Sequence, residues 1–220
     1  MKYKAFIFDM DGVIVDTARL WHSHETAYLE DLFGVETINK IGDRVGVDIK
    51  TIFQKATKYK PNITFKKYLD GYEKLAKIIY QNSDITPNLD KLAELLLKKD
   101  FQLGLVSNAK PNWIDMVLQR LTFKDKFSNI LSVYNNGRLR IKPEPDGYVE
   151  CMHKLKANPK TTIILEDSNS GIEAARESGA FTVALMENKV TNYVQIGANI
   201  YVETVTDLIK LIDKFDYLPS

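Results

Sequence analysis

Short runs of consecutive apolar residues alternate with amphipathic stretches along most of this chain. The apolar runs lie at 5–8, 101–106, 130–133, 161–165 and 181–185. Continuous runs of this length predict strands buried on both faces, as in parallel sheets covered by helices. Amphipathic segments predict helices over 89–99, 113–121 and 148–155, and a last helix carrying Leu208, Leu211, Ile212 and Phe215. The alternation predicts an α/β fold with a doubly wound, Rossmann-like parallel sheet.

The segment between the first two predicted strands breaks this alternation. Residues 18–33, 47–58 and 65–80 place apolar side chains at helical spacing, and no strand is predicted between Thr17 and Asn82. Asp16 or Thr17 can cap the first of these helices, and Gly34 follows its end. We therefore expect an inserted small α-helical domain at 17–87 and a core made of 1–16 and 88–220. Two linkers, 12–16 and 82–88, would join them.

Composition narrows the class of protein. Of the 220 residues, 45% are apolar and 27% are charged, which is typical of a globular protein and excludes disorder. The formal net charge of +1 gives no reason to expect nucleic acid or a membrane as a partner. Cys151 is the only cysteine, which excludes an internal disulfide, and no segment is typical of a signal peptide or a membrane span. We expect a cytoplasmic protein that is a monomer or a weak dimer.

Polar residues follow three of the predicted strands: Asp9 and Asp11, Ser107 and Asn108, and Glu166 and Asp167. The carboxyl ends of parallel strands meet at one edge of the sheet, where open α/β sheets place their ligands. Charges as close as those of Asp9 and Asp11 repel, so a cation or a shared proton is needed there. Gly12 lets the backbone turn close to whatever the carboxylates hold. A Gly at this position does not fit a calcium-binding EF-hand loop, in which the glycine comes later.

Four motifs occur in order across the predicted core: Asp9-Met10-Asp11-Gly12-Val13-Ile14-Val15-Asp16-Thr17, Ser107-Asn108, Lys142-Pro143-Glu144-Pro145-Asp146 and Glu166-Asp167-Ser168-Asn169-Ser170-Gly171-Ile172-Glu173-Ala174-Ala175. In these motifs the chain resembles the haloacid dehalogenase-like superfamily, which consists mostly of phosphatases and phosphomutases. The inserted helices are similar to the small cap of its β-phosphoglucomutase and phosphoglycolate phosphatase branch. The resemblance implies a phosphatase that hydrolyses a small phosphorylated metabolite through an aspartyl-phosphate. The alternative is a phosphomutase of a sugar phosphate.

The resemblance also implies a role for each motif residue. Asp9 would be the nucleophile, and Asp11 would protonate the leaving oxygen and later accept a proton from water. Lys142, fixed between two prolines, would pair with Asp9 and the phosphate. Ser107 and Asn108 would bind the transferring phosphoryl oxygens, together with Gly12 and the backbone N–H groups after Asp11.

The expected cofactor is Mg²⁺, because the available ligands are oxygens and the implied chemistry is phosphoryl transfer. The resemblance implies that Asp9 and Asp167 supply carboxylates and Asp11 its backbone carbonyl. For Glu166 the sequence leaves three alternatives: a direct ligand, a ligand through water, or a structural acid satisfied by neighbouring N–H groups. In the same motif, Ser170 is expected to open a helix through a capping box with Glu173.

The inserted domain departs from the mutase branch at two positions. Trp21 stands where that branch has a histidine, with His22 shifted by one, and Ile49 stands where it has an arginine. Arg44 is close to that second position but out of register. Because a mutase must hold a bisphosphate intermediate while it reorients, the loss of a cation favours the phosphatase. A dehalogenase would lack Asp11, and a protein that only binds ligands would show a broken motif.

Overall fold

The chain divides into two compact units in its computed structural model, which describes residues 3–42, 44, 47, 49–134, 136–190 and 192–214. One unit contains the chain up to Asp16 and from Asp84 onward, and the other is Thr17–Ser83. Residues 84–87, expected in the inserted domain, belong to the first unit. They do so because Val15 and Ile85 form an antiparallel bridge and the Thr86 N–H donates to Ile14 O. The roles of these units as core and cap remain a prediction.

The described part of the first unit contains a six-stranded parallel sheet in the order β3-β2-β1-β4-β5-β6. The strands are β1 (Ala5–Phe8), β2 (Gln102–Ser107), β3 (Phe127–Ser132), β4 (Thr162–Glu166), β5 (Phe181–Leu185) and β6 (Ile200–Val202). β1 lies between β2 and β4, and all four of its side chains are fully buried. After β1, the chain adds β2 and β3 on one side of β1 and then β4, β5 and β6 on the other. Sheets of this kind bind ligands where the strand order changes sides. The predicted doubly wound α/β fold is confirmed.

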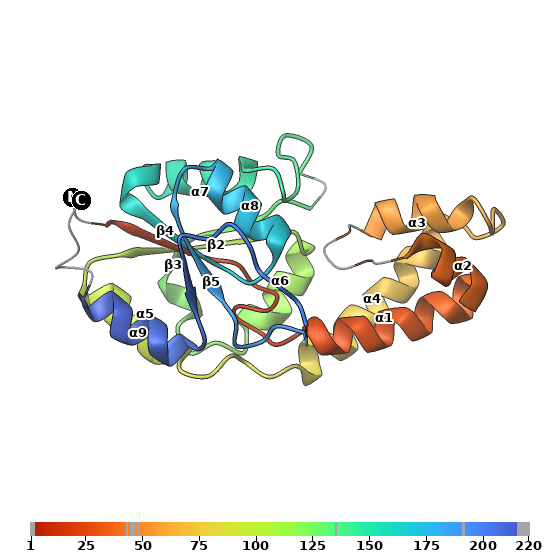
Figure 1. Ribbon diagram of the computed structural model, residues 1–220, viewed down its shortest axis with the longest axis horizontal. Coiled ribbons are helices and arrows are strands. Elements are labelled where there is room, and N and C mark those ends of the chain that lie inside the picture. Colours follow the sequence, from red (N-terminus) through yellow and green to blue (C-terminus); the bar gives the residue numbers. More distant parts are fainter. Residues whose placement is uncertain are drawn as a thin grey trace. The chain divides into compact units, whose positions relative to one another are not determined.

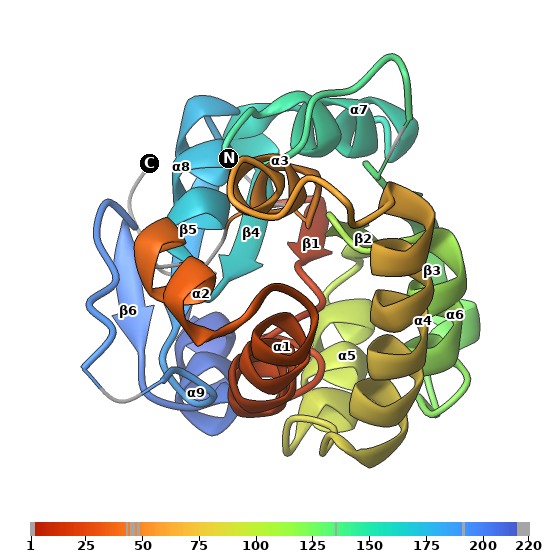
Figure 2. The ribbon, with the colours of Figure 1, turned by 90° about the vertical axis from the view of Figure 1, so that its right-hand side faces the viewer.

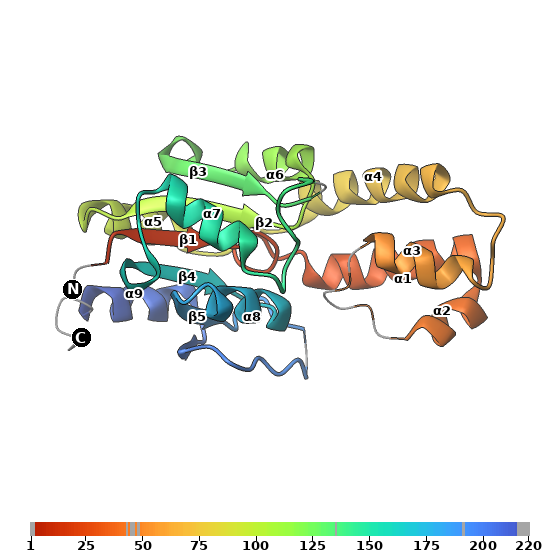
Figure 3. The same cartoon turned by 90° about the horizontal axis from the view of Figure 1, so that it is seen from above.

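Helices cover both faces of this sheet (Figures 1 and 2). α7 (Asp146–Lys154) and α8 (Asn169–Glu177) lie on one face, and α5 (Leu89–Lys98) and α9 (Val205–Lys214) lie on the other. Figure 3 shows β3, β2, β1 and β4 side by side beneath α7. The remaining elements are α6 (Pro111–Leu118) and two 3₁₀ turns, η1 (Lys124–Lys126) and η2 (Pro159–Thr161). Covering both faces explains why the central strands are continuous apolar runs.

The described residues of the second unit form helices and the loops between them. It contains α1 (Ala18–Phe33), α2 (Val35–Ile41), α3 (Ile49–Thr57) and α4 (Phe65–Asn82). Its centre is aromatic: Tyr68 and Tyr72 are fully buried, and the Trp21 ring stacks on Tyr72 with a centroid distance of 6.0 Å. Within the described residues of the whole chain, no helix has the length and apolar character needed to cross a bilayer.

The structure differs from the sequence prediction in three local features. α8 begins at Asn169 with Ser168 as its N-cap, because Ser168 Oγ accepts the Gly171 N–H at 3.1 Å; the predicted capping box from Ser170 is wrong. α2 was not predicted, since seven residues between two glycines carry little periodic signal. β6 was not predicted either, because it has only three residues at the edge of the sheet. Phe215, expected in the last helix, lies outside the described residues.

Candidate functional site

Asp9 lies where β1 ends, at the centre of the sheet. Its N–H donates to Leu165 O of β4 at 3.0 Å, and its side chain is 10% exposed. Burial raises the pKa of Asp9 well above its usual range; Lys142 acts in the opposite direction, and the charges of Glu166 and Asp11 add to the rise. A carboxylate in this position needs positive charge nearby to stay ionised.

Lys142 provides positive charge to two carboxylates at once. Its Nζ contacts Asp9 Oδ1, lies 2.6 Å from Glu166 Oε1, and donates to Val106 O at 3.2 Å. The Tyr148 ring lies against the same ammonium, with its centroid 4.8 Å from Nζ. Burial acts to lower the pKa of Lys142, but the negative charges of Asp9 and Glu166 raise it overall. Lys142 is therefore protonated and fixed in place.

Glu166 is fully buried, and both of its carboxylate oxygens accept hydrogen bonds from the protein. Oε1 accepts from Lys142 and from the Tyr148 hydroxyl, each at 2.6 Å. Oε2 accepts the N–H groups of Asp167 and Ser168 at 3.0 and 3.3 Å. Of the three alternatives left by the sequence, this geometry favours the structural acid, since protein donors already occupy both oxygens.

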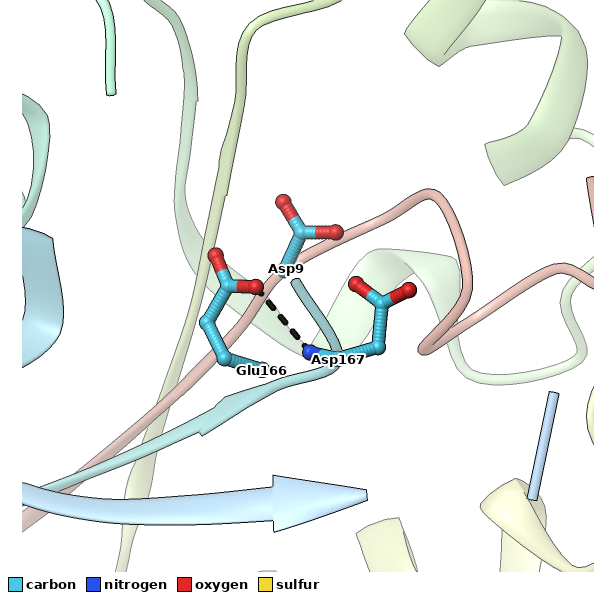
Figure 4. A group of neighbouring side chains, drawn as sticks. All are labelled: Asp9, Glu166 and Asp167. Carbon is cyan, nitrogen blue, oxygen red and sulfur yellow. Dashed lines mark hydrogen bonds between the residues drawn. The ribbon is translucent and has the colours of Figure 1, made fainter. Parts of the chain in front are cut away.

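Three carboxylates meet at this edge of the sheet (Figure 4). Asp9, Glu166 and Asp167 each offer an oxygen, and these atoms lie within 4.8 Å of one another. Burial raises the pKa of Asp167 well above its usual range, and the charges of Glu166 and Asp9 raise it further. Clustered, desolvated carboxylate oxygens are the donor set that a hard divalent cation such as Mg²⁺ prefers, and its charge would remove their repulsion. The residues present therefore fit this cation.

Gly12 is required next to this cluster for steric reasons. Its φ is +84°, and a Cβ at this position would lie 1.9 Å from Asp167 Oδ2. The Asp167 carboxylate thus occupies the space that a side chain at position 12 would fill.

The N–H groups of the turn after Asp9 donate hydrogen bonds within the turn itself. The Gly12 N–H donates to Val15 O at 2.8 Å, and the N–H groups of Ile14 and Val15 donate to Met10 O at 2.8 and 3.1 Å. These donors are directed into the turn, so this conformation does not present them to a phosphate. The phosphate-binding role expected of Gly12 and of the N–H groups after Asp11 stays a prediction, and the structure adds a steric reason for the glycine.

Ser107 is the last residue of β2 and Asn108 follows it, at the carboxyl end of a strand that pairs with β1. Ser107 is 1% exposed, and its Oγ accepts the Ala109 N–H at 3.0 Å. Asn108 Oδ1 accepts the Lys142 N–H at 3.1 Å. The side-chain groups that can donate to a phosphoryl oxygen are therefore the Ser107 hydroxyl and the Asn108 Nδ2.

The loop that carries Lys142 is closed by an ion pair between its two ends. Asp146 accepts the backbone N–H of Arg140 at 2.9 Å and two guanidinium N–H groups at 3.0 and 2.7 Å. These hydrogen bonds lower the pKa of Asp146 to about 2. Arg140 is therefore a structural residue of this loop.

Sequence reasoning missed two residues of this region. Tyr148 had one signal, since it lies six residues after Lys142 at the start of a helix, but nothing indicated its hydroxyl bond to Glu166. Asn188 had no signal at all. Its Nδ2 donates to Gly12 O at 3.1 Å and to Thr86 Oγ1 at 2.7 Å, which ties the two linkers together.

In the second unit, Arg44 is held by two side chains of α1. Its Nη2 donates to Thr26 Oγ1 at 2.8 Å, and its Nε lies 3.7 Å from Glu25 Oε2. Burial raises the pKa of Glu25, against the opposing effects of Tyr72 and Arg44. Gly46 and Asp48, which precede Ile49, lie outside the described residues.

Comparison with known proteins agrees with this arrangement. Residues 6–185 match the family described as haloacid dehalogenase-like hydrolase. A phosphorylated carbohydrates phosphatase of Thermotoga maritima is 28% identical over 185 residues, 80% of this chain and 82% of that protein. The β-phosphoglucomutase of Bacillus subtilis is 26% identical over 217 residues, 93% of this chain and 91% of that protein.

Solved structures show the same fold. The crystal structure of a HAD hydrolase, family IA, variant 3, from Entamoeba histolytica matches with a TM-score of 0.74 at 19% identity, covering 94% of this chain and 99% of that one. The family match spans every strand that carries the site, from β1 through β5. The chain therefore belongs to the haloacid dehalogenase-like hydrolases, and it is an enzyme of that family.

Proposed function

We propose that this enzyme is a Mg²⁺-dependent phosphatase that hydrolyses the phosphomonoester of a small phosphorylated metabolite through an aspartyl-phosphate. The observation that carries the proposal is the buried Lys142 ammonium held between Asp9 and Glu166 beside a third carboxylate, Asp167. A protonated lysine fixed against a carboxylate is suited to stabilise charge on a phosphoryl group as it transfers.

Asp9 acts as the nucleophile in this proposal. Its carboxylate oxygen attacks phosphorus, the alcohol leaves, and water later hydrolyses the acyl phosphate, which divides one difficult step into two. The Lys142 ammonium supports this because it favours the ionised carboxylate and so opposes the rise in the pKa of Asp9 that burial causes. Asp11, two residues along the same turn, donates a proton to the leaving oxygen and then accepts one from the attacking water.

The phosphoryl oxygens are bound from the end of β2 and by Lys142. Ser107 donates through its hydroxyl and Asn108 through its Nδ2, while the oxygen of each side chain accepts a bond from the protein. Asn108 therefore has two roles, since it also orients the backbone of Lys142. These donors are fixed before substrate arrives, which lowers the reorganisation needed in the transition state.

Mg²⁺ would be held by the carboxylates of Asp9 and Asp167 and by the Asp11 backbone carbonyl. When bound, the cation offsets the repulsion between the attacking carboxylate and the anionic phosphoryl group. Glu166 is assigned to Lys142 instead, because its two oxygens accept five hydrogen bonds from Lys142, Tyr148, Asp167 and Ser168.

We propose a sugar phosphate or a related polyol phosphate as the substrate class, with the unit Thr17–Ser83 as the cap that selects it. The support is that relatives of this chain include a phosphatase of phosphorylated carbohydrates, a β-phosphoglucomutase and a hexitol phosphatase. A phosphomutase is the second candidate, because the β-phosphoglucomutase aligns over 93% of this chain. Against it, Arg44 is engaged by Thr26 and Glu25 within its own unit.

The test is a panel of sugar, polyol, glycolyl and nucleotide phosphates with Mg²⁺, scored for both free phosphate and positional isomers. Release of phosphate supports the phosphatase, and formation of an isomer supports the mutase. Asp9→Asn should abolish turnover while the protein stays folded, and the exposed Asp125→Asn is the matched control. Full activity of Asp9→Asn would overturn the aspartyl-phosphate assignment.

A further inference from the structure

Gln195 lies far along the chain from every motif, yet it contacts the candidate cation site. It belongs to the connection between β5 and β6, and its side chain is buried while Val194 and Ile196 on either side are 71% and 64% exposed. This alternation is typical of an extended segment with one inward-facing residue. Gln195 is thus directed into the sheet at its carboxyl edge.

One nitrogen of Gln195 joins the ends of two strands. Nε2 donates to Asp167 O at 2.5 Å and to Leu185 O at 2.7 Å. The register of β4 and β5 pairs Glu166 with Ala184, so Asp167 and Leu185 would form the next pair. β4 ends at Glu166 and β5 ends at Leu185, so both carbonyls lie at the ends of their strands. Gln195 supplies a donor to each of them from a third segment.

Residues 193–196 also bind Asn169, which lies two residues after Asp167. Asn169 donates its backbone N–H to the Tyr193 hydroxyl at 2.7 Å, and its Nδ2 donates to Val194 O at 2.9 Å. Its Oδ1 accepts the Ile196 N–H at 2.9 Å. Residues 193–196 therefore bind the 167–169 turn at four points, two of them through the Asn169 side chain.

The Gln195 amide is also incompletely satisfied. Its Oε1 is buried and has no hydrogen-bond partner in the part of the chain that the structure describes. A desolvated acceptor without a partner lowers stability, so packing alone does not explain an amide at this position. The side chain contributes through the two short hydrogen bonds that it donates to Asp167 O and Leu185 O.

We infer that Gln195 is a positioning residue that fixes the main chain of Asp167 and thereby orients its carboxylate toward the cation. The inference rests on the proposed function, in which Asp167 is a ligand. The Asp167 carboxylate has little freedom, because it fills the space above Gly12. A rotation of its peptide group would move the carboxylate out of that space. Groups that orient a metal ligand from behind typically change affinity by about 10–100-fold when they are removed.

The test is the dissociation constant of Mn²⁺, a hard cation with a paramagnetic signal, measured by electron paramagnetic resonance without substrate. Gln195→Met keeps the length of the side chain and removes both donations. Asn199→Ala is the matched control, since Asn199 Oδ1 accepts the Thr182 N–H at 2.7 Å near the opposite end of β5. We expect Gln195→Met to weaken Mn²⁺ binding by about 10-fold or more, and the control to leave it unchanged even where both lower the Tm.

An unchanged Mn²⁺ dissociation constant in Gln195→Met, beside a lowered Tm, would make Gln195 merely structural and overturn the inference. If Gln195→Met does not fold, Asn169→Ala loosens the same turn from the surface; weaker binding supports the inference, and wild-type affinity overturns it. Failure of the wild-type protein to bind Mn²⁺ or Mg²⁺ is a different result, because it removes the cation from the proposed function itself.

Discussion

Replacing Gly12 with alanine tests whether the cation site depends on the space that this glycine leaves. Gly12 has a φ of +84°, a conformation that costs a residue with a Cβ roughly 1–2 kcal/mol. The added Cβ would also lie 1.9 Å from Asp167 Oδ2 and 2.4 Å from its Cγ. Ordinary contacts of a Cβ begin near 3.4 Å, so the carboxylate must move by about 1.5 Å.

A movement of this size should be much more harmful to activity than to folding. Displacing an aligned group by about 1 Å can cost on the order of 100-fold in rate. We therefore expect Gly12→Ala to lower kcat by about that factor, to raise the Mg²⁺ concentration needed for half-maximal activity, and to lose roughly 1–2 kcal/mol of unfolding free energy.

Gly137→Ala separates the two effects. Gly137 has a similar φ of +71°, but nothing lies within 4 Å of a Cβ built there. This variant should show the backbone strain alone, with wild-type kcat and Mg²⁺ dependence. The assays are phosphate release across a Mg²⁺ titration and unfolding in urea. If Gly12→Ala behaves like Gly137→Ala in both assays, the steric reasoning is refuted.

Three further predictions follow from the same network. Tyr148→Phe removes a hydrogen bond to a buried carboxylate, so the free energy of unfolding in urea should fall by about 1.5–3 kcal/mol while the Mg²⁺ requirement persists; unchanged stability would contradict the role of the hydroxyl. Mg²⁺ at 100 times its Kd should stabilise the wild-type protein by about 2.7 kcal/mol, as seen in its Tm, and both EDTA and Asp167→Asn should remove that gain; a gain that survives Asp167→Asn would count against the site. Because Arg140 lowers the pKa of Asp146 to about 2, their stabilising effect is complete above about pH 4 and is lost as the pH falls toward 2, so Asp146→Asn should flatten this part of the stability profile; parallel profiles would refute it.

Local pattern was enough to predict the centre of the site. β1 is a four-residue apolar run that ends at Asp9, and the structure places that run in the middle of the sheet. Ser107 and Glu166 also end predicted strands, and parallel pairing brings all three to one edge because each strand borders β1. These predictions succeed because strand identity and the direction of the chain can both be inferred from nearby residues.

The hydrogen bonds between distant segments could not be inferred in this way. The sequence shows Gly12 as a flexible position, but not that its N–H is used by Val15 or that its open side holds Asp167. Ser168 and Ser170 offer the same hydroxyl to the start of α8, and only the fold decides that Ser168 caps it. Gln195 carries no pattern at all, since its contact with Asp167 depends on where the β5–β6 connection returns to the sheet.

The charges of the site explain why one lysine would not suffice for the proposed reaction. Asp9, Glu166 and Asp167 are clustered acids, and Lys142 is the cation that contacts two of them. With all three ionised, the cluster keeps a net negative charge, and a phosphomonoester would add to it. Because Glu166 holds Lys142 from behind, the ammonium stays on Asp9 instead of moving away with a departing anion. Glu166→Gln should therefore loosen Lys142 and impair the attack step more than substrate binding, which would appear as a fall in kcat with little change in KM; a rise in KM alone would place Glu166 in substrate binding instead.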